Sequence, residues 1–215
     1  MSTTIYMIRH GESEANERDA FLGHHDLPLT ATGRRQAQVT ADFLTGHVQK
    51  PDVIYSSDLS RAYETAMATA ERVQMPITTD QGLREINAGL WENVTFAELR
   101  EKFPKSFGIW QENIGLAQCD GGETVRQLQT RVVAAITRIA KKHENSVVFL
   151  FTHATPIRIV AAHCLGKSLG ELKTVPWAAN ASVTKVVFDG QSFSLAEYSR
   201  DDFMGDLVTR LSADV

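Results

Sequence analysis

An apolar segment over residues 5–8 ends abruptly in Arg9, His10 and Gly11. Its β-branched and aromatic side chains are typical of a buried strand. A glycine directly after a strand allows a tight turn and lets a ligand approach the backbone. In open α/β sheets, ligands bind at the carboxyl ends of the strands. The segment therefore predicts a strand that presents an arginine and a histidine to a site at the edge of a sheet.

Two further apolar segments end in the same way. Residues 52–55 lead into a helix whose first turn holds Arg61, and residues 146–151 lead into His153 at the start of another helix. An arginine is unfavourable at a helix N-terminus unless an anion lies nearby, because the positive end of the helix dipole is already there. Phosphate is the anion that best matches such donors. Each residue alone also fits a structural role, so the hypothesis of a phosphate site depends on all three strand ends together.

The rest of the chain alternates predicted helices and strands without a linker, a repeat or a low-complexity tract. We expect helices over residues 30–46, 60–73 and 125–143, another after His153, and two short ones that start in capping boxes at Thr95 and Ser168. Asp189-Gly190 predicts a hairpin over residues 182–198. The pattern predicts one α/β domain over residues 1–215. It should have three αβα layers, a mostly parallel sheet with helices on both faces, and an antiparallel edge strand.

Several motifs, taken in order, resemble those of the histidine phosphatase superfamily, also called phosphoglycerate mutase-like. The matching stretches are residues 9–16, 26–37, 57–66, 85–92 and 121–124, followed by His153. Each motif alone is a weak signal, but their shared order along the chain makes the resemblance specific.

The resemblance implies a catalytic role for five residues. His10 would be the nucleophile that forms a phosphohistidine. Arg9, Arg61 and His153 would hold the phosphoryl oxygens and stabilise the charge of the transition state. Glu85 would give a proton to the leaving oxygen and later take one from water. This scheme requires no metal and no cofactor.

The expected substrate-binding set is wider, and the chain departs from the family pattern inside it. Glycines usually follow the second histidine, whereas Ala154 and Thr155 stand here, and Asn93 replaces the usual glycine after Trp-Glu. The Thr155 hydroxyl could contact phosphate instead, and asparagine tolerates the positive φ of a turn. The residues expected to bind substrate are Arg9, Asn16, Gly23, Arg61, His153 and Ala154.

These residues predict a metal-independent phosphomonoester hydrolase that acts on a small phosphorylated metabolite. Phosphoglycerate mutase-type transfer is the main alternative, followed by a non-catalytic phosphate-binding module. A metal hydrolase is disfavoured because Arg9 and Arg61 would repel a cation. A cysteine phosphatase is disfavoured because no arginine stands six positions after Cys119 or Cys164. The sequence does not identify the leaving group.

Composition limits the partners. The net charge of −4 disfavours a nucleic-acid surface, and no apolar segment is long enough to span a membrane, so we expect a cytoplasmic enzyme. Cys119 and Cys164 are expected to be free thiols. Both the oligomeric state, with a homodimer as one option, and the roles of His24 and His25 stay open.

Overall fold

The strand that ends in Arg9 lies inside a six-stranded sheet of order β4-β3-β6-β1-β7-β8 in the computed structural model, which describes residues 2–211. The strands of this sheet are β1 (Thr3–Arg9), β3 (Val53–Ser56), β4 (Ile77–Thr79), β6 (Val147–Thr152), β7 (Val183–Phe188) and β8 (Phe193–Arg200). β1 pairs in parallel with β6, and β3 pairs in parallel with β6 and β4. The expected hairpin, β7 and β8, pairs antiparallel with β1 through β7. Because β1, β3 and β6 run in parallel, their carboxyl ends meet at one edge.

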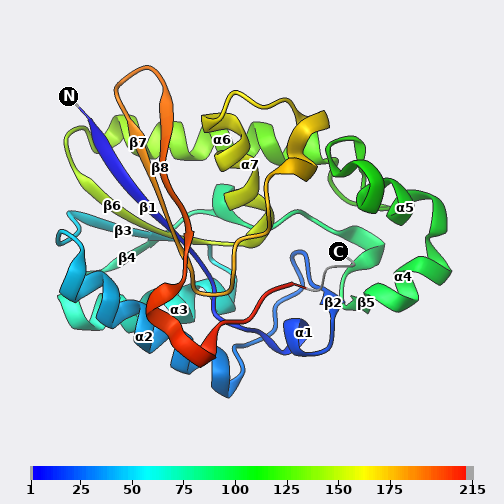
Figure 1. Cartoon of the computed structure of the whole chain (residues 1–215), viewed down its shortest axis with the longest axis horizontal. Coiled ribbons are helices and arrows are strands. Elements are labelled where there is room, and N and C mark those ends of the chain that lie inside the picture. The colour runs from blue at the N-terminus through cyan, green and yellow to red at the C-terminus, as the bar shows by residue number, and fades with distance from the viewer. Residues whose placement is uncertain (1, 212–215) are drawn as a thin grey trace.

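Helices cover both faces of this sheet (Figure 1). One face carries α2 (Ala31–His47) and α3 (Ser60–Val73), and the other carries α6 (Val125–Lys142) and α7 (Ala154–Cys164). The expected three-layer αβα domain with an antiparallel edge is therefore confirmed. Within residues 2–211, no helix is long and apolar enough to cross a membrane.

The two faces of β1 belong to separate cores because side chains alternate along a strand. Ile8 shares one apolar cluster with Phe43 of α2 and Ala66 of α3. Met7 points the other way and shares a larger cluster with Ile136 of α6. Burial on both faces fixes the register of β1, and thereby the place at which its last residue and His10 emerge.

A smaller region lies beside the carboxyl edge of the sheet. It holds α1 (Glu14–Glu17), a two-stranded sheet of β2 (Ala20–Phe21) and β5 (Val94–Thr95), α4 (Phe96–Lys102) and α5 (Pro104–Asn113). The capping box at the start of α4 is present as predicted. The sequence did not predict α1 or the small sheet, because strands of two residues and a helix of one turn carry no periodic pattern. The sequence did not predict α5 either.

Short 3₁₀ helices connect several elements. The capping box at Ser168 is present, but the segment behind it, Leu169–Thr174, is a 3₁₀ helix and not the expected α-helix. The sequence signal of a capping box specifies a helical start, and the later turns depend on packing. The 3₁₀ helices are η1 (Gln81–Leu83), η2 (Gly89–Trp91), η3 (Ile114–Leu116), η4 (Leu169–Thr174) and η5 (Asp202–Leu207).

The turn after His10 is anchored on the first turn of α2 by backbone contact. A Cβ added at Gly11 would lie 2.4 Å from the carbonyl oxygen of Gly33, and one added at Gly33 would lie 2.0 Å from that of Glu12. Thr30 caps α2, and its amide also donates to the Glu12 carbonyl at 3.0 Å. Two glycines therefore allow the helix and the turn to approach at backbone distance.

We expect Gly33→Ala to destabilise the protein by about 2 kcal/mol or more, because backbone atoms on both sides must separate to admit the methyl group. Gly46→Ala, in the same helix, provides the matched control. Nothing lies within 4 Å of its added Cβ, so this change should be neutral or stabilise by about 0.5 kcal/mol. Urea unfolding of both variants measures the difference, and equal stability of the two would contradict the close-contact interpretation.

Candidate active site

A pocket opens at the carboxyl edge of the sheet, between β1, the start of α7 and the small two-stranded sheet. It contains about 480 Å³ of space, part of it open to solvent. Its lining combines charged and polar groups with apolar and aromatic ones. The lining residues are Arg9, His10, Ser13, Asn16, Ala20, Phe21, Leu22, Gly23, Arg61, Glu85, Phe96, Trp110, Ala154, Thr155, Trp177 and Leu211.

The His10 ring is held in one tautomer. Its Nδ1 lies 2.7 Å from the carbonyl oxygen of Gly11. Since a carbonyl oxygen can only accept, Nδ1 carries the proton of the neutral ring and Nε2 keeps its lone pair. A lone pair on a lining residue is what nucleophilic attack on a ligand requires.

His10 and His153 form a buried pair whose ring centroids are 5.2 Å apart. His153 Nε2 lies 2.9 Å from the Ser57 hydroxyl. Burial lowers the pKa of both rings well below the ordinary value of 6.5, and the charge of Arg61 lowers both further. Both imidazoles are therefore neutral at physiological pH, which keeps Nε2 of His10 available.

Arg9 and Arg61 are buried cations held by main-chain carbonyls. Arg9 Nη1 donates to the Ala178 carbonyl at 2.6 Å. Arg61 donates from Nη2 to the Gly23 carbonyl at 2.8 Å and from Nη1 to the His25 carbonyl at 3.1 Å. Burial lowers the pKa of each guanidinium to about 10, so both stay charged at neutral pH. Carbonyls fix the two side chains without neutralising them, and this leaves a positive charge for an anionic ligand.

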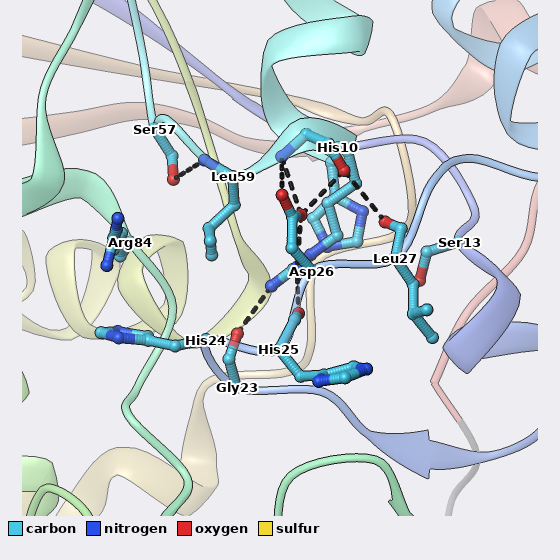
Figure 2. Close-up of polar contacts among 12 residues, drawn as sticks. His10, Ser13, Gly23, His24, His25, Asp26, Leu27, Ser57, Leu59 and Arg84 are labelled. Atoms are coloured by element: carbon cyan, nitrogen blue, oxygen red, sulfur yellow. Dashed lines mark hydrogen bonds and ion pairs between the residues drawn. The ribbon is translucent and has the colours of Figure 1, made fainter.

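Asp26 anchors the segment that holds Arg61. The N-cap residue of α3 is Leu59, and its side chain makes no capping bond. The Asp26 carboxylate instead accepts from the Ser60 amide at 2.8 Å and from the Ser60 hydroxyl at 2.7 Å (Figure 2). Its Oδ1 also lies 3.9 Å from Nη1 of Arg61. A cap supplied from a distant loop leaves no local sequence signal.

Glu85 reaches the pocket from the segment between η1 and η2. Its Oε2 accepts from the Thr155 amide at the start of α7, at 3.2 Å, and its Oε1 accepts from the Ile86 amide at 2.8 Å. The Glu85 carbonyl is held by Arg131 Nη2 at 2.9 Å. The carboxyl group is thus oriented by backbone donors at the pocket wall.

Asn16 is oriented by an equally specific network. Its Oδ1 accepts from the Ser13 amide at 3.0 Å and from Asn180 Nδ2 at 3.2 Å. Asn180 Nδ2 lies also 3.3 Å from the His10 carbonyl. Because the oxygen is engaged, the Asn16 Nδ2 group remains as the donor that this lining residue can offer a ligand.

The structure brings most of the predicted site residues to the pocket. His153 is the exception, because it is fully buried behind His10 and forms no part of the pocket surface. Neither His24 nor His25 lines the pocket; His24 Nε2 donates to the Glu85 carbonyl at 2.9 Å. The predicted residues that do line the pocket are Arg9, His10, Asn16, Gly23, Arg61, Glu85, Ala154 and Thr155.

Other lining residues were missed by the sequence. Of the aromatic residues between Asn87 and Cys119, Phe96 and Trp110 reach the pocket, while Trp91 is core. No motif distinguishes a pocket aromatic from a core aromatic, and the segments that supply the others lie far away in the chain. The missed residues are Ser13, Ala20, Phe21, Leu22, Trp177 and Leu211.

The cysteines and acidic residues of the described part of the chain form no second reactive or metal-binding site. Cys119 and Cys164 are free, as predicted, and burial raises the pKa of Cys164 to about 11. Over residues 2–211, no three His, Cys, Asp or Glu side chains gather as a metal site would require.

The fold and the arrangement of these side chains are typical of an α/β enzyme that binds phosphate. Comparison with known sequences identifies the family. The chain belongs to the histidine phosphatase superfamily (branch 1), whose pattern matches residues 5–201. The resemblance noted from the motifs is thereby confirmed.

Several relatives of this chain are phosphatases by name. It is 32% identical to phosphoserine phosphatase 1 of Hydrogenobacter thermophilus over 78% of each chain. It is 31% identical to the metal-independent phosphoserine phosphatase of Arabidopsis thaliana over 92% of this chain and 81% of that one. Among solved structures, Bacillus stearothermophilus YhfR superposes with a TM-score of 0.88 at 31% identity, covering 94% of this chain and 98% of that one.

The two neutral histidines make stability depend on pH. Their lowered pKa means that the unfolded chain binds protons below pH 6.5 that the folded protein does not bind. The free energy of unfolding should therefore fall as pH drops from 6.5 toward the folded-state pKa, by up to about 1.4 kcal/mol per pH unit for each histidine. Urea unfolding between pH 7 and 5, in phosphate-free buffer, measures this slope.

His10→Gln should reduce the slope of the unfolding free energy against pH by up to about 1.4 kcal/mol per pH unit, because the glutamine does not titrate in either state. Gly46→Ala, which changes no titratable group, is the control and should leave the slope as in the parent protein. A slope that His10→Gln does not change would mean that the folded protein protonates this ring.

Proposed function

We propose that this protein hydrolyses phosphomonoesters of small metabolites through a phosphohistidine on His10, without a metal. One observation carries the proposal. In the pocket that His10 lines with its unprotonated Nε2, two buried guanidinium nitrogens have no hydrogen-bond partner: Arg9 Nε and Arg61 Nε. Buried donors without partners are costly, and a phosphoryl group would satisfy donors of this kind. The names of the relatives, metal-independent phosphoserine phosphatase among them, support the same reaction class.

In the first step, Nε2 of His10 would attack phosphorus opposite the ester oxygen. The bond from nitrogen to phosphorus forms as the bond from phosphorus to the ester oxygen breaks. The Gly11 carbonyl would hold the Nδ1 proton and stabilise the positive charge that develops on the ring. Arg9 and Arg61 would stabilise the charge on the phosphoryl oxygens, because they are fixed in place before the reaction.

Glu85 would supply the proton that the leaving alkoxide needs, so that the alcohol departs neutral. It would then take a proton from a water molecule that attacks the phosphohistidine, which releases orthophosphate and restores His10. The amides of Ile86 and Thr155 orient the carboxyl group for both steps. A carboxyl group oriented at the pocket also argues against a module that only binds phosphate, since a carboxylate would repel the ligand.

Hydrolysis is favoured over mutase-type transfer by the charge of the pocket. A mutase must hold a second phosphate while the first is transferred, which requires further cations. Among the described residues that line the pocket, Arg9 and Arg61 are the arginines, and lysine is absent. The pocket would therefore release the dephosphorylated product and admit water.

His10→Ala should abolish turnover of phosphomonoesters while the protein stays folded, because the residue lies beyond the end of β1 and outside the apolar core. His163→Ala, at an exposed position of α7, is the matched control and should keep the parent activity. Rapid quenching of the parent enzyme should trap an acid-labile, base-stable phosphoryl group on His10, located by mass spectrometry. Turnover by a folded His10→Ala protein would refute the nucleophile assignment.

Glu85→Gln should slow hydrolysis of alkyl phosphates by roughly 10²- to 10⁴-fold, because the alkoxide would leave without a proton. The same variant should lose far less activity on p-nitrophenyl phosphate, whose leaving group needs little protonation. The ratio of kcat values on the two substrates is the measurement. Equal losses on both would show that Glu85 binds or positions the substrate and does not donate a proton.

A further inference from the structure

Besides the groups that would hold the phosphoryl moiety, the pocket is lined by apolar side chains, several of them aromatic. A leaving group attached to a phosphate at His10 would contact this part of the lining. We refer to it as the apolar wall. Its residues are Ala20, Phe21, Leu22, Phe96, Trp110, Trp177 and Leu211.

Aromatic contacts fix the apolar wall. Phe21 meets Trp110 edge to face, with ring centroids 5.0 Å apart, and Trp110 stacks on Trp177 at 6.4 Å with 18° between the planes. The Arg158 guanidinium lies 4.0 Å from the centroid of the Trp177 ring. Its Nε donates to the Val175 carbonyl at 2.6 Å. The rings are therefore positioned before any ligand enters, and a rigid apolar surface gains free energy by covering an apolar group.

The C-terminal segment brings a further apolar side chain to the pocket. Figure 1 shows this segment leaving η5 and returning toward β2. The Asn180 amide donates to the Thr209 carbonyl at 3.0 Å, and Gln36 Nε2 donates to the Thr209 hydroxyl at 2.9 Å. These bonds hold the chain just before Leu211, which lines the pocket together with β2.

The apolar wall contains no charge that could pair with a second anionic group. Arg9 and Arg61 are the arginines among the described lining residues, and both are assigned to the phosphoryl group. Nearby arginines are engaged elsewhere: Arg84 with Asp58 at 2.5 Å, and Arg131 with Glu123 at 2.7 Å. Arg158 packs on Trp177 but donates to the Val175 and Lys173 carbonyls and does not line the pocket. A carboxylate placed against the apolar wall would lose its hydration and face Glu85, with no cation among the wall residues to pair with it.

We propose that the substrate is a phosphomonoester of an uncharged, ring-bearing alcohol, and that esters whose alcohol carries a carboxylate or a second phosphate are poor substrates. The inference rests on the phosphatase function proposed above and names its substrate class. It separates this protein from relatives named for phosphoserine, whose alcohol carries a carboxylate. The apolar alcohol would leave when His10 is phosphorylated, and water would then release orthophosphate.

Three primary alkyl phosphates test the inference without a bias from leaving-group reactivity: 2-phenylethyl phosphate, ethyl phosphate and O-phosphoserine. Burial of the phenyl ring should raise kcat/KM for 2-phenylethyl phosphate roughly 10- to 100-fold above that for ethyl phosphate. O-phosphoserine should be turned over no faster than ethyl phosphate. A kcat/KM for O-phosphoserine or 3-phosphoglycerate above that for 2-phenylethyl phosphate would overturn the inference.

Variants of the apolar wall locate the effect. Trp177→Ala should lower kcat/KM for 2-phenylethyl phosphate about tenfold, mainly through KM, and leave ethyl phosphate almost unchanged. Leu211→Lys should raise kcat/KM for 3-phosphoglycerate relative to 2-phenylethyl phosphate at least tenfold, because it adds a cation where the leaving group lies. Leu165→Ala, an exposed change 51% accessible at the end of α7 and away from the pocket, is the control. Unchanged ratios in both wall variants would contradict the assignment.

The outcomes for the two proposals are distinct. If none of these esters, nor p-nitrophenyl phosphate, releases orthophosphate and His10 acquires no phosphoryl group, the phosphatase function itself fails. If His10 is phosphorylated and O-phosphoserine is the best substrate, the function stands and the inference about the apolar wall fails.

Discussion

The structure depends on two arginines that are buried beside two histidines, with Asp26 as a long-range partner of Arg61 at 3.9 Å and no carboxylate in a close ion pair with either arginine in the described residues. Burial of a cation is costly, and here main-chain carbonyls of Ala178, Gly23 and His25 offset part of that cost. A carbonyl is a dipole and not a charge, so the positive potential survives. That potential and the dry surroundings keep both histidines neutral. The same constraint would prepare both the anion site and the nucleophile of the proposed reaction.

The surrounding elements can be understood as supports for this arrangement. Gly33 and Gly11 let α2 and the turn after β1 meet at backbone distance, which fixes the place of His10. Asp26 caps α3 from a separate loop and thereby fixes the first turn that carries Arg61 (Figure 2). Glu85 is oriented by the Thr155 amide of α7. Each group of the site is therefore positioned by contacts between segments distant in sequence, which makes its geometry a property of the whole domain.

The two parts of the pocket lining divide the functions between chemistry and selection. The charged groups would recognise what all phosphomonoesters share, and they come from β1 and the turn after it, from α3 and from the segment between η1 and η2. The apolar wall would contact the leaving group, which is the part in which phosphomonoesters differ. Its residues come from β2 and the residue after it, α4, α5, the segment at Trp177 and the segment at Leu211. Loops and short elements can change without disturbing the buried sheet, so one phosphoryl site can serve different leaving groups.

The sequence by itself determined the sheet strands, the long helices and the residues at three strand ends, because apolar periodicity and strand-to-helix turns are local signals. It also identified Arg9, His10, Arg61 and Glu85 through ordered motifs. Only the tertiary structure decided the His10 tautomer, the cap from Asp26, the burial of His153 behind the pocket and the membership of the apolar wall. These features depend on distances between segments far apart in the chain, and such distances exist only once the layers have packed.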